Sequence, residues 1–179
     1  IKLDYLNNLD YELDKKLYQY FKFELDIKDK YICFNPNSSK KNKEITIDEW
    51  IKIYKFCKNE YKYIKFILIG SNYGEKGRKF KDIINKFNYN ILILPDLNLL
   101  EIGLFLKKYC YLLISLDTSI YHLSEFQKVK TLAIFFNNIH SKNNMISWGN
   151  ISNKKFNLFS YNFDYMCNNI INILQDKHY

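Results

Sequence analysis

The sequence predicts an α/β fold in which helices cover both faces of a doubly wound parallel sheet. Two observations carry this prediction. Short apolar runs alternate along the chain with segments of helical periodicity, and short links join them. The runs are apolar almost throughout, which is typical of strands that are covered on both faces. At 179 residues, the chain is long enough to bury a core of its own.

Six apolar runs are the candidate strands, and each is followed by a segment with a different pattern. In chain order, these runs are residues 31–35, 64–70, 90–94, 111–116, 131–136 and 156–160. Because helical segments separate the first five runs from one another, each of these strands is expected to lie parallel to its neighbours.

The helices are expected where apolar residues recur at spacings of three and four. This periodicity marks residues 9–23, 47–57, 80–87, 99–109, 119–127 and 163–174. The tetrapeptide Thr46-Ile47-Asp48-Glu49 also predicts how the second helix begins. It has the spacing of a capping box, in which the side chains of Thr46 and Glu49 each bond the other's backbone N–H.

The first helix precedes the repeating pattern of strand and helix. We therefore expect residues 1–30 to form a linker and an inter-domain helix. Residues 31–179 are expected to form the domain that contains the sheet.

The formal net charge is +8, and it comes almost wholly from Lys, since Arg78 is the only Arg. Codon bias in an A/T-rich genome explains such an excess without any function. The functional alternative is an anionic partner, such as a nucleotide, a membrane surface or nucleic acid. We expect no nucleic acid among the partners, because the lysines are scattered and no RNA- or DNA-binding motif occurs.

The four cysteines lie far apart and form no Cys-x-x-Cys pair. We therefore expect free thiols in a reducing compartment, and no metal site. No signal peptide is evident, and no apolar run approaches the ~18 residues that a membrane-spanning helix needs. These features predict a cytoplasmic location.

The most informative segment is the end of the fourth apolar run. The run stops at Asp117-Thr118-Ser119, and a helix is expected from there, with His122 one turn further on. The free N–H groups at a helix start attract anions, and Thr118 and His122 share one helix face. The arrangement suits a phosphate group. Asp117 is expected to be the N-cap residue, which is the role that such an Asp often has.

Two other strand ends carry polar groups. Ser38 and Ser39 follow the first strand, and Lys43 comes four residues later, so these groups could hold phosphate oxygens; an ordinary polar turn explains them equally. Glu75 follows the second strand in a glycine-containing loop that matches neither a dinucleotide nor a Walker motif. It could bond ribose hydroxyls, or simply be an acid in the first turn of a helix.

Taken together, these parts resemble one family. The first parts are a strand with a Ser-rich loop (residues 31–39), then Lys43, and a helix that bears Trp50. A second strand follows, with Gly70 and the acidic Glu75 after it. The last parts are a leucine-rich helix (residues 97–108) and, after an apolar strand, the motif Asp-Thr-x-x-x-His-Leu (residues 117–123). The chain thus resembles the C-terminal, donor-binding domain of glycosyltransferase family 9, the lipopolysaccharide heptosyltransferases. The resemblance covers roughly residues 9–136.

This resemblance implies a Rossmann-like domain, the C-terminal half of a GT-B glycosyltransferase that binds ADP-heptose or a similar nucleotide sugar. It implies no obligatory cofactor or metal. The residues implied to hold the donor phosphates are Ser38, Ser39, Lys43, Asp117, Thr118, Ser119 and His122. Glu75 would meet the ribose, and His122 would stabilise the leaving group. The acceptor would be a glycan or a lipid-linked molecule, which implies peripheral contact with the inner face of a bacterial inner membrane.

The sequence departs from the family pattern at three places. Ser119 replaces the usual Gly, and Phe136-Asn137-Asn138 stands where a Gly-Pro-Thr type of segment is expected. The N-terminal domain, which in this family supplies the acceptor site and the catalytic carboxylate, is missing from the chain. No catalytic base is therefore expected here. The alternative is a non-catalytic module that binds a nucleotide or a partner protein, such as a degenerate transferase domain.

Overall fold

The computed structural model describes residues 2–38, 45–134, 155–158 and 163–175. Its six strands form one sheet with the order β3-β2-β1-β4-β5-β6, and every neighbouring pair is parallel. The strands are β1 (Tyr31–Asn35), β2 (Lys65–Leu68), β3 (Leu92–Ile93), β4 (Cys110–Leu116), β5 (Thr131–Ile134) and β6 (Lys155–Leu158). The α/β prediction with a doubly wound, Rossmann-like sheet is confirmed.

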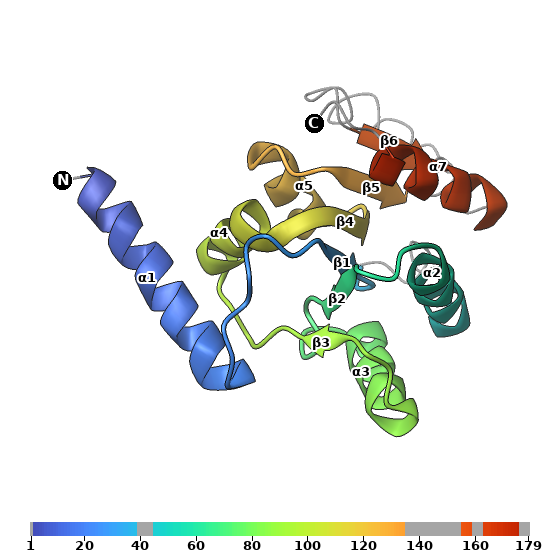
Figure 1. Cartoon of the computed structure of the whole chain (residues 1–179), viewed down its shortest axis with the longest axis horizontal. Coiled ribbons are helices and arrows are strands. Elements are labelled where there is room, and N and C mark those ends of the chain that lie inside the picture. Colours follow the sequence, from blue (N-terminus) through green and yellow to red (C-terminus); the bar gives the residue numbers. More distant parts are fainter. Residues whose placement is uncertain (1, 39–44, 135–154, 159–162, 176–179) are drawn as a thin grey trace.

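Helices flank this sheet on both sides (Figure 1). They are α1 (Lys2–Phe21), α2 (Ile47–Glu60), α3 (Glu75–Phe87), α4 (Leu99–Tyr109), α5 (Ser119–Phe126) and α7 (Phe163–Gln175). One side carries α2, α3 and α7, and the other carries α1, α4 and α5. None of the described helices is both long and apolar enough to cross a membrane.

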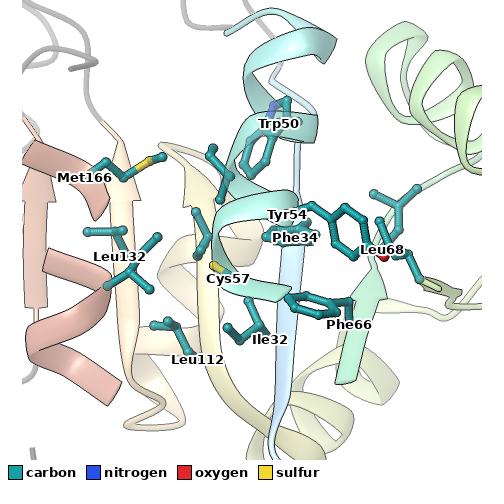
Figure 2. Close-up of a cluster of buried hydrophobic side chains, with 14 of the residues drawn as sticks. Ile32, Phe34, Trp50, Tyr54, Cys57, Phe66, Leu68, Leu112, Leu132 and Met166 are labelled. Carbon is teal, nitrogen blue, oxygen red and sulfur yellow. The ribbon is translucent and has the colours of Figure 1, made fainter. Parts of the chain in front are cut away.

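The sheet has a separate apolar core on each face, because successive side chains of a strand point to opposite faces. Along β1, Ile32 and Phe34 enter the core beneath α2, whereas Tyr31 and Cys33 enter the core beneath α4. Figure 2 shows the first of these cores, in which Trp50 of α2 stands over Phe34 with the ring centroids 5.8 Å apart. Burial on both faces explains why the strands are apolar throughout.

Capping boxes begin two of the helices. In α2, the Thr46 side chain accepts a bond from the backbone N–H of Glu49, and the Glu49 carboxylate accepts one from the backbone N–H of Thr46. The predicted capping box is thus confirmed. Asn98 and Glu101 form the same arrangement at α4. These caps satisfy N–H groups that have no partner inside the helix, so each helix begins at a defined residue.

The first helix packs onto α4 and the sheet. Its Leu13 and Leu17 are buried in the same core as β1, and Lys16 forms an ion pair with Glu101 of α4 at 3.0 Å. Asp14 accepts hydrogen bonds from Lys108 and Tyr109 at the end of α4, at 2.6 and 2.7 Å. That α1 is an inter-domain helix remains a prediction, but its inner face is part of this domain's core.

The order of the strands reverses between β1 and β4. From β1 the chain continues to β2 on one side, whereas β4 continues to β5 on the other. Asn35 at the end of β1 pairs with Ser115 of β4, so the residues that follow both strands emerge at the same place. In open α/β sheets, ligands bind in the crevice at such a reversal, at the carboxyl ends of the strands.

Candidate functional site

The start of α5 lies at this reversal point. Thr118 is the N-cap residue, with extended backbone angles (φ −146°, ψ 174°), and its side chain makes no capping hydrogen bond. The prediction that Asp117 caps the helix is therefore wrong. Helical geometry begins at Ser119, so the half-helical residue is Thr118 and not Asp117. The Thr118 side chain therefore bonds none of the free N–H groups in the first turn of α5.

Asp117 instead faces His122. Its Oδ1 lies 3.7 Å from Nε2 of His122, and its carboxylate is almost completely buried while the imidazole is 43% exposed. The carboxylate thus lies behind a ring that reaches solvent. A protonated His122 would form an ion pair with Asp117 on one side and could meet an anion on the other.

Tyr121 packs against the ring of His122, with the centroids 4.9 Å apart. Burial, and to a smaller degree the nearby charge of Asp117, raise the pKa of Tyr121 to about 12. Tyr121 is therefore a neutral phenol at physiological pH. It contributes packing against His122 and no charge of its own.

A buried amide that sequence reasoning missed connects β1 to α5. Asn35 is 2% exposed, and its Nδ2 donates to Oγ of Ser115 and to Oγ1 of Thr118, both at 2.9 Å. The signal in the sequence was an amide at the last position of an otherwise apolar strand. That position is at the reversal point, where the side chain can reach the neighbouring strand's end.

A second amide that sequence reasoning missed, that of Asn37, explains why the loop after β2 contains glycines. Its Nδ2 donates to the carbonyl of Gly70 at 2.6 Å, and its Oδ1 accepts from the N–H of Gly77 at 2.8 Å. A Cβ on Gly74 would lie 2.3 Å from that Oδ1, and one on Gly77 would lie 2.5 Å from the Gly70 carbonyl. These glycines make room for the Asn37 amide, which also bonds an N–H in the first turn of α3.

The remaining predicted residues lie at the same edge of the sheet or outside the described residues. Ser38 lies in the loop after β1, which ends at Asn35 beside β4, the strand that leads to α5. Glu75 is the first residue of α3, and its carboxylate forms an exposed ion pair with Lys79 at 2.5 Å. Its contact with a ribose remains a prediction. Ser39 and Lys43 lie outside the described residues, so their roles also remain predictions.

A cavity of about 860 Å³ lies at the opposite edge of the sheet, between α1, residues 24–27 and the end of α4. Within it, Asp14 is paired with Lys108. We place the candidate site at the carboxyl edge instead, because hydroxyl, imidazole and helix-start N–H groups converge there. Among the described residues, no three side chains that could ligate a metal lie together.

The chain is similar to known proteins of one family. A family model described as glycosyltransferase family 9 (heptosyltransferase) matches residues 3–175. Among solved structures, E. coli ADP-heptose LPS heptosyltransferase II superposes with a TM-score of 0.71 at 11% identity, over 94% of this chain and 53% of that one. A family 9 glycosyltransferase from Veillonella parvula gives a TM-score of 0.68 at 14% identity, over 96% of this chain and 46% of that one.

E. coli heptosyltransferase WaaC, solved with ADP, gives a TM-score of 0.65 at 11% identity, over 87% of this chain and 47% of that one. The chain therefore spans about half the length of these solved structures. No match was found among curated protein sequences. At these identities the superpositions show the fold, whereas the family is shown by the match that extends over nearly the whole chain.

Proposed function

Since the chain belongs to glycosyltransferase family 9 (heptosyltransferase), we propose that it is the donor-binding half of a glycosyltransferase that uses a nucleotide sugar. The observation that carries this proposal is the start of α5 at the reversal point, where the Thr118 hydroxyl and the partly exposed His122 imidazole lie together. The proposed donor is ADP-heptose or a similar nucleotide sugar. The ADP in the WaaC structure supports that choice.

In this proposal, the donor diphosphate lies across the carboxyl ends of β1 and β4. Its ligands are Ser38, Ser39, Lys43, Thr118, Ser119 and His122. Asp117 holds the His122 ring from behind at 3.7 Å. Glu75 bonds the ribose from the start of α3. It gives up its ion pair with Lys79 to do so, which costs little because both side chains of that pair are exposed.

The proposed reaction is the attack of an acceptor hydroxyl on the anomeric carbon of the sugar, with inversion. The new bond joins the acceptor oxygen to that carbon. The bond from the carbon to the diphosphate oxygen breaks, and the electron pair leaves with the nucleoside diphosphate. The α5 N-terminus, Lys43 and His122 stabilise the growing negative charge, which is the largest contribution in many such reactions. No obligatory metal is proposed.

The proton of the acceptor hydroxyl goes to a base outside this chain. We propose that a second, N-terminal domain supplies this base together with the site for a lipopolysaccharide or other glycan acceptor. A lipid-linked acceptor would bring the enzyme to the cytoplasmic face of a membrane. The net charge of +8 supports peripheral contact with anionic lipids there.

The full-length protein tests the enzymatic part of this proposal. It should be incubated with acceptor and a panel of ADP-, UDP- and GDP-sugars, and the release of nucleoside diphosphate should be measured. We expect release with one class of donor and a loss of roughly 10- to 1,000-fold in kcat/KM for His122→Ala, because a donor to the leaving group is removed. Lys62→Ala, at the opposite edge of the sheet, serves as the control.

Release by His122→Ala at the rate of the unchanged protein would contradict the proposed role of His122. A full-length protein that binds a nucleotide sugar but transfers nothing to any acceptor would favour the non-catalytic module instead. Titration with nucleoside diphosphates alone separates binding from transfer.

A further inference from the structure

A chain of hydrogen bonds fixes the direction of the Thr118 hydroxyl. It begins at Ser115, whose Oγ donates its only hydrogen to the carbonyl of Leu116 at 2.8 Å. The same Oγ lies 2.9 Å from the side-chain amide of Asn35. Since the hydroxyl hydrogen is already used, Oγ must accept at this contact, and the amide group that faces it must be the NH₂.

The NH₂ group of Asn35 has two hydrogens and two oxygen partners. The second partner is Oγ1 of Thr118, also at 2.9 Å, so Oγ1 accepts there. A hydroxyl has one hydrogen, and that of Thr118 is thereby directed away from Asn35. The Thr118 side chain makes no capping hydrogen bond to α5, which would also have used Oγ1 as an acceptor. Thr118 can then act as a donor to a ligand in front of the helix.

The geometry points to Asn35 as a positioning residue for the donor diphosphate: it holds Thr118 Oγ1 as a hydrogen-bond donor to a phosphate oxygen. This inference rests on the proposed function. Asn35 does not touch the ligand, since it is 2% exposed at the end of β1. Its effect is transmitted through Thr118, which is only half-buried at the reversal point. The arrangement favours an anionic group, which can only accept.

The direction of these hydrogen bonds also explains why residue 35 is an amide. A carboxylate of the same shape would accept from both hydroxyls and turn the Thr118 hydrogen inward. It would also add a negative charge beside the phosphates. An alkyl side chain would leave the half-buried Thr118 hydroxyl free to rotate and would leave the buried Ser115 Oγ without its donor.

A double-mutant cycle tests this inference, with ADP as the probe and calorimetric titration as the measurement. Thr118→Val should weaken ADP binding about 10- to 100-fold, as expected for the loss of a hydrogen bond to a charged group. Asn35→Ala should weaken it about 3- to 10-fold, because the hydroxyl remains but loses its direction. In the Thr118→Val background, Asn35→Ala should cause no further loss.

Two further measurements separate positioning from simple destabilisation. Asn169→Ala deletes another buried amide, whose Nδ2 bonds the Tyr165 carbonyl in α7, so it should lower stability without weakening ADP binding. Adenosine, which lacks the phosphates, should bind Asn35→Ala as it binds the unchanged protein. Equilibrium unfolding in urea confirms that each variant is folded before titration.

The outcomes distinguish this inference from the function on which it rests. Full additivity of the two substitutions, or an equal loss of ADP and adenosine affinity in Asn35→Ala, would overturn the positioning role while the diphosphate site stands. If the unchanged protein binds no nucleoside diphosphate, the proposed function falls and the role of Asn35 falls with it.

Discussion

Buried polar side chains at the strand ends determine what their half-exposed neighbours can do. Asp117 is buried behind His122, and Asn35 is buried behind Thr118. Each buried group contacts a side chain that reaches solvent: Asp117 lies 3.7 Å from Nε2 of His122, and Asn35 donates a hydrogen bond to Thr118. A site built in this way loses little conformational entropy when a ligand arrives, because its ligating groups are already oriented.

The loop around Asn37 gives a stability prediction. In Gly77→Ala, the new Cβ would lie 2.5 Å from the backbone carbonyl of Gly70, which cannot move easily. We expect a loss of about 1–3 kcal/mol in the free energy of unfolding in urea, as is typical of overpacking. Gly103→Ala is the matched control in a helix. Its Cβ would meet mainly the flexible end of Leu123 at 3.2 Å, and Ala favours helix, so we expect a change within about 1 kcal/mol.

Tyr121 gives a prediction for alkaline pH. Its pKa of about 12 in the folded protein lies above the ordinary tyrosine pKa of 10.0, so between these two pH values the unfolded chain loses a proton that the folded chain keeps. The contribution of Tyr121 to the free energy of unfolding is therefore fully present below pH 10 and falls as the pH rises toward 12. In urea unfolding at several pH values, Tyr121→Phe should make this decline shallower. Tyr63→Phe, at a side chain that is 93% exposed, should not change the slope.

Helix α1 illustrates how an element outside the sheet becomes part of the core. Leu17 is 2% exposed in the core beneath α4, whereas Tyr18 is 52% exposed. Leu17→Ala should lower the free energy of unfolding by about 2–5 kcal/mol, because a buried cavity is created. Tyr18→Ala should change it by less than ~1 kcal/mol. Equal and small effects of both substitutions would mean that α1 is only tethered to the domain.

The elements differ in how well sequence patterns predict them. Strand β1 and helix α4 have the predicted bounds, because a Pro-containing turn and the Asn98 cap mark their ends. The predicted strand 90–94 is reduced to Leu92–Ile93, and the structure places it at the edge of the sheet beside β2 alone. Having only one neighbour limits its pairing, and local periodicity cannot report how many neighbours a strand has.

The whole sheet explains why the candidate site could be predicted only in part. The order of the strands brings Ser38, Glu75 and Thr118 to one edge of the sheet. This placement could be predicted, because alternation of strands and helices in the sequence predicts a parallel sheet. The amides of Asn35 and Asn37 were missed, because an amide next to a strand end is also typical of an ordinary turn. Their roles depend on contacts 33 to 83 residues away in sequence, which no local pattern contains.

The central claim is that a nucleoside diphosphate binds at the start of α5. Its most direct test is calorimetric titration of the protein with ADP, UDP and GDP, repeated for His122→Ala and for the control Lys62→Ala. We expect saturable one-site binding of at least one of these nucleotides, about 10-fold or more weaker in His122→Ala and unchanged in Lys62→Ala. Absence of binding by all three, or affinity that is unaffected by His122→Ala, would contradict the assignment of this site.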